Sequence, residues 1–232
     1  MKFVGSGGEP RAYIEWKRKN RDVSPLPFDA LEFPKDEVKA ALLRKQGWIC
    51  PYTLLEIAEI GTCHIEHVQP QSRCPDLAAE FSNMIACFPL DGAANIGFGA
   101  PEKKDKDGAS DNFLSPFDPS CEVSCLYQQD GRVVGADQRA VHTICKVLNL
   151  NHDSLKEKRL AAFRARGITV RPSKGRVRRP APASLRQAQD LVSQIMLMDG
   201  SGKLASFCVA IRQVAQFYAC TLQDSKKKTR QN

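Results

Sequence analysis

The segment CHIEHVQPQS, residues 63–72, holds the most informative side chains of this chain. Two of the four histidines, His64 and His67, and the acid Glu66 lie within four consecutive residues. The segment is typical of a β-strand, in which alternation places His64 and Glu66 on one face and His67 on the other unless the strand ends or bulges. A carboxylate beside an imidazole suits metal-assisted phosphodiester hydrolysis, because a cation neutralises the phosphate while histidine accepts a proton from water. Taken alone, the cluster is equally compatible with a surface pair or a structural metal site.

The flanking sequence predicts a small unit of one hairpin and two helices around this strand. Residues 35–47 have helical spacing and end at a glycine, and residues 48–52 and 62–68 are β-prone segments that we expect to pair as a hairpin. Residues 78–87 have apolar side chains at helical spacing and predict a helix. Residues 89–112 are rich in Gly, Asp and Lys and predict a loop.

The second half of the chain predicts another hairpin and several helices. The hairpin turns at Asp130-Gly131, and the helices are expected over 137–148, 153–166, 184–198 and 204–222. The apolar faces of the last two helices need cover from the rest of the chain or from another protein. We therefore expect an α+β protein with an N-terminal domain over 1–167, a basic connector over 168–183 and a C-terminal helical region with a basic tail over 184–232.

The positive charge is local. The net charge is +8, and between Lys156 and Pro180 ten lysines or arginines accompany a single acid. Such a stretch favours a polyanion, although a solubilising linker has the same composition. The candidate phosphate-binding residues are Lys103, Lys104, Arg171, Lys174, Arg176, Arg178 and Arg179.

The composition places the chain among globular proteins, since 42% of its residues are hydrophobic. It has no apolar run long enough for a membrane span and no apolar centre of an export signal. Its nine cysteines are odd in number and irregularly spaced, which favours reduced thiols. We expect a soluble, cytoplasmic protein that does not enter membranes.

The motif around residues 64–72 resembles the first motif of HNH nucleases, which adopt the ββα-metal fold: a hairpin and a helix around one cation. The resemblance implies that Glu66 is a metal ligand, that His67 is the general base and that His64 ligates or orients the metal. The middle asparagine of the motif, which braces the loop that carries the base, matches Asn83. The implied cofactor is a divalent cation, Mg²⁺ or alternatively Mn²⁺.

The resemblance extends beyond this motif to a particular group of HNH proteins. The ordered segments QGWICPYT, NMIACFP, EKKDKDG, LSPFDPSCEVSCLYQQDGRVVG and LNLNHDSLKEKR resemble the PtuB proteins of retron and Septu anti-phage systems. The resemblance covers roughly residues 1–166. It implies a defence nuclease that works with a PtuA-like ATPase and, in retron versions, with a reverse transcriptase and its multicopy single-stranded DNA.

Two departures from the HNH pattern stand out. Many HNH proteins hold structural zinc with two CxxC pairs, but Cys50 and Cys87 each lack the second cysteine, so no structural zinc is expected. The last metal ligand of the pattern has no clean counterpart. Asn95 is the nearest residue of the right type, and Asp91 competes with it.

The sequence thus predicts a metal-dependent HNH endonuclease acting on nucleic acid, either DNA or RNA. The alternative is a non-catalytic nucleic-acid-binding adaptor that keeps the HNH fold only as a scaffold. The incomplete last motif supports this alternative.

Overall fold

The structure, a computed structural model, describes residues 1–23, 26, 28, 32–104, 112–169 and 180–230. Helices dominate, and the strands form two separate two-stranded antiparallel sheets, β1–β2 and β3–β4, in agreement with the expected α+β class. The elements follow in the order α1 (Arg11–Lys19), α2 (Lys35–Gln46), η1 (Ile60–Thr62), β1 (His64–His67), η2 (Pro75–Leu77), η3 (Phe81–Asn83), β2 (Met84–Cys87), α3 (Ala100–Lys103), α4 (Cys121–Ser124), β3 (Cys125–Tyr127), β4 (Val133–Gly135), α5 (Gln138–His142), the π-helical turn η4 (Thr143–Val147), α6 (Asp153–Ala165), α7 (Leu185–Gln194) and α8 (Cys208–Arg230).

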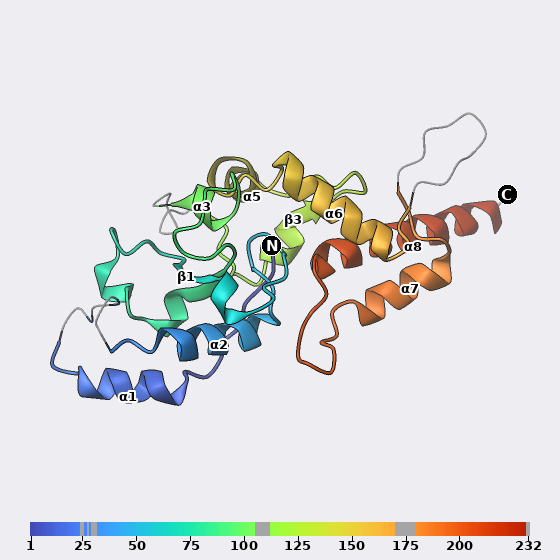
Figure 1. Cartoon of the computed structure of the whole chain (residues 1–232). Coiled ribbons are helices and arrows are strands. Elements are labelled where there is room, and N and C mark those ends of the chain that lie inside the picture. Colours follow the sequence, from blue (N-terminus) through green and yellow to red (C-terminus); the bar gives the residue numbers. More distant parts are fainter. Residues whose placement is uncertain (24–25, 27, 29–31, 105–111, 170–179, 231–232) are drawn as a thin grey trace.

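The first and the last helices of the chain lie at opposite ends of the molecule, whereas Met1 lies between them, beside Tyr127 of β3 (Figure 1). Helices α1 and α2 lie together at one end, and α7 and α8 lie together at the other (Figure 1). The sheet β1–β2 lies against α2, while β3 lies against α8. One hydrophobic cluster, running from Met1 to Val214 in sequence, connects these parts.

The strand partner of β1 differs from the prediction. β1 pairs with β2, with His64 opposite Cys87 and His67 opposite Met84, and the predicted pairing with residues 48–52 is wrong. Residues 48–57 fold on themselves instead, through one isolated bridge between Ile49 and Glu56. Pro51 lies in this segment and has no amide hydrogen to donate to a ladder, which explains why a full strand does not form there.

The predicted helix over residues 78–87 is also wrong. Only the short turn η3 is helical, and the chain then becomes the strand β2, of which all four residues are buried. A short apolar run fits a buried strand as well as a buried helix, so its periodicity does not distinguish them. Asn83 ends the turn because its side chain bonds to Gln69, across the loop, instead of the local backbone.

The outer edge of β2 is satisfied by a glutamine from α2. The buried Gln46 accepts a hydrogen bond from Ala86 N (2.7 Å) and donates to Ala86 O (2.8 Å) and Ile49 O (3.1 Å). A side-chain amide thereby replaces the missing third strand. Buried backbone groups need such partners, since an unpaired one costs about 1–3 kcal/mol.

The second hairpin and the later helices confirm the prediction in outline. β3 and β4 are antiparallel around a turn in which Gly131 has a φ of +81°. Asp137 caps α5 by accepting from Ala140 N, and Ser184 caps α7 by accepting from Gln187 N. Gln213 of α8 accepts a hydrogen bond from Tyr127 N and donates one to Cys125 O of β3. Its side-chain amide therefore satisfies the edge of β3, as that of Gln46 satisfies the edge of β2.

The C-terminal helices are covered in part by the same chain. Leu204 N donates to Gly47 O and Phe207 N donates to Leu54 O, both at 2.9 Å. Gly47 has a φ of +67°, and a Cβ there would lie 2.6 Å from Leu204 Cγ, so glycine is required for the turn and for this contact. The helix α8 extends to Arg230, past its predicted end at Leu222 and through the expected tail. Among the described helices none combines the length and the apolar character that a membrane crossing requires.

We predict that Gln46→Leu lowers the free energy of unfolding by about 3 kcal/mol, because it leaves the backbone N–H and C=O of Ala86 buried without partners. Urea unfolding followed by circular dichroism measures this change. Gln216→Leu, on the exposed face of α8, is the matched control and should shift the midpoint little. Equal stabilities for the two variants would contradict the assigned role of Gln46.

Candidate active site

Strand β1 presents its polar residues on two sides, as alternation predicts. His64 and Glu66 share one side, where His64 Nε2 lies 3.6 Å from Glu66 Oε2. Their side chains are only 16% and 14% exposed. The His67 ring makes a different set of contacts, with the loop that joins β1 to β2.

The tautomer of His64 suits a metal ligand. Its Nδ1 lies 2.5 Å from the carbonyl oxygen of Pro89, which can only accept, so Nδ1 carries the hydrogen. In the neutral ring the lone pair is therefore on Nε2, which faces Glu66. A metal-binding histidine is typically oriented in this way by a carbonyl on its other nitrogen. Burial opposes protonation, but Glu66 and the Pro89 carbonyl outweigh it and raise the pKa of His64 above its ordinary value.

Glu66 is shared between His64 and a buried lysine. Lys103, the last residue of α3, is 1% exposed, and its Nζ lies 2.8 Å from Glu66 Oε1 and donates to His67 O at 3.0 Å. Oε1 is buried and accepts no well-aligned hydrogen bond from the described residues, so its contact with Lys103 is an ion pair without directional bonding. The helix α3 interrupts the predicted loop over residues 89–112 and turns the side chain of Lys103 inward, so this candidate phosphate-binding residue does not face solvent. Lys104, the next residue, is exposed.

A layer of thiols and a phenol lies next to this pair. Cys87 is opposite His64 in the ladder, and Cys50 and Tyr52 are buried nearby. Burial, with a further contribution from Glu66, raises the pKa of Tyr52 well above its ordinary value, and burial likewise raises that of Cys87. Among the described residues no three His, Cys, Asp or Glu side chains form a ready-made metal cluster. His64 and Glu66 together would therefore supply two protein ligands.

The His67 ring is held by the loop between β1 and β2. Its Nε2 lies 2.7 Å from the carbonyl oxygen of Ala78 and 3.1 Å from the side-chain nitrogen of Gln71. One ring nitrogen cannot donate to Ala78 and accept from Gln71 at once, so the shorter contact assigns the hydrogen to Nε2. The neutral ring then has its lone pair on Nδ1. Phe28 packs edge-on against the ring, with centroids 4.6 Å apart.

Asn83 fastens the same loop at both ends. Its Oδ1 accepts from Gln69 N (2.8 Å), and its Nδ2 donates to Gln69 O (3.0 Å) and Leu77 O (3.2 Å). The side chain is buried, and Val68 N also donates to Asn83 O. These hydrogen bonds hold the two ends of the loop between β1 and β2 together.

Asn95, the expected third metal ligand, does not lie beside His64 and Glu66. Asn95 is exposed, and its side-chain oxygen accepts from Gly97 N in a local turn. Asp91 is better placed, because it lines a small pocket of about 180 Å³ together with His64. The pocket is closed on another side by Ala100 and Pro101 of α3.

Most of the predicted phosphate-binding residues lie outside the part of the chain that the structure describes. Arg171, Lys174, Arg176, Arg178 and Arg179 all lie within residues 170–179, outside the described residues.

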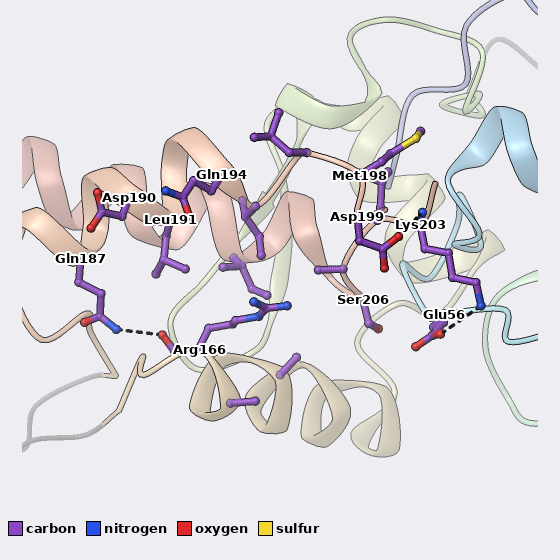
Figure 2. A pocket seen from close by; sticks show the side chains of 17 residues that line it. Glu56, Arg166, Gln187, Asp190, Leu191, Gln194, Met198, Asp199, Lys203 and Ser206 are labelled. Carbon is purple, nitrogen blue, oxygen red and sulfur yellow. Dashed lines mark hydrogen bonds and ion pairs between the residues drawn. The ribbon is translucent and has the colours of Figure 1, made fainter. Parts of the chain in front are cut away.

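A larger pocket, of about 680 Å³, lies away from β1. Figure 2 shows it between α6, α7 and the loop before α8. Its polar groups are largely paired with one another: Gln187 donates to Arg166 O, and Lys203 lies 4.0 Å from Glu56. The residues that line it include no histidine or cysteine, so it lacks the chemistry of the β1 site.

Sequence reasoning missed the buried ion pair and the aromatic contact to His67. Lys103 stands in a run of charged residues, EKKDKD, where nothing distinguishes it from its solvated neighbours. Phe28 precedes His67 by 39 positions and belongs to no motif. Neither residue carries a local signal, because each acts through a contact made by the fold.

Comparison with known proteins adds no relative. No protein-family model matches the chain, and no curated protein matches it either.

We predict that Asn83→Ala lowers the free energy of unfolding by about 2–3 kcal/mol, because the loop loses three hydrogen bonds from a buried position. Hydrogen exchange of residues 68–82 should also accelerate. Asn95→Ala, which removes one exposed bond, is the control and should change stability by less than about 0.5 kcal/mol. An Asn83→Ala protein with native stability would show that the loop is held by other contacts.

Proposed function

We propose that this chain is a metal-dependent HNH-type endonuclease that hydrolyses phosphodiester bonds of nucleic acid. The observation that carries the proposal is the arrangement on β1. His64 directs its Nε2 toward Glu66, and the next histidine, His67, has its Nε2 held by the backbone carbonyl of Ala78.

The order of the elements supports the same proposal. A strand, a long loop braced by Asn83, a paired strand and then the helix α3 follow one another, which is the order of a ββα-metal unit. Lys103 connects this helix back to β1. The unit would sit in an α+β chain with additional helices and a second hairpin.

The side chains on β1 fit a cation with two protein ligands. His64 Nε2 and Glu66 Oε2 would hold Mg²⁺ or Mn²⁺, and carboxylate oxygen with imidazole nitrogen is a donor set that such ions accept. When bound, the cation supplies positive charge that stabilises the scissile phosphate and the leaving oxygen.

His67 supplies the acid–base chemistry. With Nε2 donating to Ala78 O, Nδ1 accepts the proton of a water that attacks phosphorus. The Ala78 carbonyl fixes the tautomer and stabilises the ring as it becomes positively charged. Phe28 limits rotation of the ring, so the base stays oriented.

The ordered sequence motifs extend the proposal to a biological setting. They favour a PtuB-like defence nuclease that works with a PtuA-like ATPase, with a reverse transcriptase and multicopy single-stranded DNA as further partners in a retron. Arg171, Lys174, Arg176, Arg178 and Arg179, with the exposed Lys104, are proposed to contact phosphates. Phosphate contacts do not distinguish DNA from RNA, so both belong in the test.

A second candidate function is a non-catalytic nucleic-acid-binding adaptor. The observation that favours it is the Glu66–Lys103 ion pair, because a carboxylate already neutralised by an ammonium is a poor cation ligand. The exposed position of Asn95 points the same way.

We predict that His67→Gln lowers the rate of phosphodiester cleavage by at least about 100-fold, because the amide can still donate to Ala78 O but cannot accept a proton. The melting temperature should change little. Cleavage is measured by incubating the protein and Mg²⁺ or Mn²⁺ with plasmid DNA and with total RNA, and by sequencing the ends.

The exposed His142→Gln variant is the control and should cleave at the wild-type rate. Undiminished cleavage by His67→Gln would remove His67 from the mechanism. Retained nucleic-acid binding without cleavage by the wild type, on either substrate and with either ion, would favour the adaptor.

A further inference from the structure

The side chain of Lys103 is unusual because a charged ammonium is buried almost completely. It is 1% exposed, and its contacts are Glu66 Oε1 at 2.8 Å and the carbonyl oxygen of His67 at 3.0 Å. Removing an ammonium from water costs several kcal/mol unless an opposite charge compensates. Glu66 provides that charge, so the two residues are stable in the interior only as a pair.

The two carboxylate oxygens of Glu66 have different partners. Oε1 faces Lys103, and Oε2 faces His64 Nε2. A divalent cation held by Oε2 and Nε2 would therefore lie within a few ångströms of the Lys103 ammonium. Repulsion at that separation is strong where water is largely excluded.

We propose that Lys103 is a built-in cation that competes with the divalent ion for Glu66, so that the site takes up metal only when Lys103 leaves. This inference rests on the proposed function of the β1 site. In this proposal the ion pair is the metal-free state of the site, in which the ammonium of Lys103 neutralises the carboxylate of Glu66 in place of the metal.

The attachment of Lys103 suits such a role. α3 has only four residues, and it is bounded by Gly99 and Lys104, which both have positive φ. It is fastened at its start, where Gly99 N donates to Leu148 O at 2.8 Å, whereas its last residue is fastened by the Lys103 contacts to β1. Outward rotation of this single turn would break the ion pair.

The same turn also covers the approach to His64. Ala100 and Pro101 line the small pocket that contains His64 and Asp91. Movement of α3 would therefore free Glu66 and widen this pocket together. Such a movement would link metal binding to a conformational change of the site.

The test is the affinity of Mn²⁺ for the full-length chain, measured by calorimetry and by electron paramagnetic resonance. Lys103→Met keeps the length and apolar stem of the side chain and removes the charge, so it should bind Mn²⁺ roughly tenfold tighter than wild type. Lys104→Met removes an adjacent exposed charge and should bind as wild type does. Glu66→Gln should lose binding.

The outcomes distinguish the competition by Lys103 from the proposed metal site itself. Equal or weaker binding by Lys103→Met, with wild-type binding intact, overturns the competition while leaving the proposed metal site in place. Absence of Mn²⁺ binding by both wild type and Lys103→Met overturns the metal site itself, and the competition with it.

A measurement on the wild type serves if Lys103→Met does not fold. In ¹⁵N-lysine-labelled protein the buried ammonium should give a protected NMR signal, since it is ion-paired with Glu66 and donates to His67 O. Saturation with Mg²⁺, followed on the His64 ring, should abolish that protection. A Lys103 signal that persists unchanged at Mg²⁺ saturation overturns the proposal.

Discussion

The antiparallel register of β1 and β2 is the constraint on which the rest of the structure depends. A shift of one residue would turn every side chain of β2, whose four residues are all buried, to the opposite face. The register sets His64 opposite Cys87 and His67 opposite Met84. It thereby sends His64 and Glu66 toward α3 and leaves His67 to the loop. The geometry of every candidate catalytic group follows from this pairing.

A two-stranded sheet inside a protein has unpaired edges, and this chain satisfies them with side chains from distant elements. Gln46 completes the edge of β2, Gln213 completes that of β3, and Asn83 holds the loop where the ladder ends. Each contact uses a neutral amide, which donates and accepts at once and carries no charge to desolvate. Lys103 is the exception, and its burial needs the charge of Glu66.

The sequence predicted the elements with strong local signals. Helix α2, the β3–β4 hairpin and the capped helices α5 and α7 follow from glycine stops, an Asp-Gly turn and side-chain caps. It failed where tertiary contacts override local preference: residues 48–52 turn at Pro51, and residues 84–87 are a strand because β1 needs a partner. At the site, strand alternation predicted that His64 and Glu66 share one face, and the motif resemblance pointed to Asn83 as the brace of the loop. The burial of Lys103 could not be predicted, because its partner lies 37 positions earlier and the helix that aims it is four residues long.

The nuclease and the adaptor assign different roles to the ion pair between Lys103 and Glu66. For an adaptor, the Lys103–Glu66 pair is simply a structural link between α3 and β1. That interpretation does not require His64 to direct its Nε2 toward the same carboxylate, nor the His67 ring to be held by Ala78 O, since neither arrangement improves a link made by Lys103. In the proposed nuclease, both arrangements would have a use: one directs a ligand and the other orients a base. An apolar pair would also fasten α3 without the desolvation penalty of two buried charges. What distinguishes the proposed chemistry from a structural link is thus the orientation of the two histidines beside this ion pair, and not the ion pair itself.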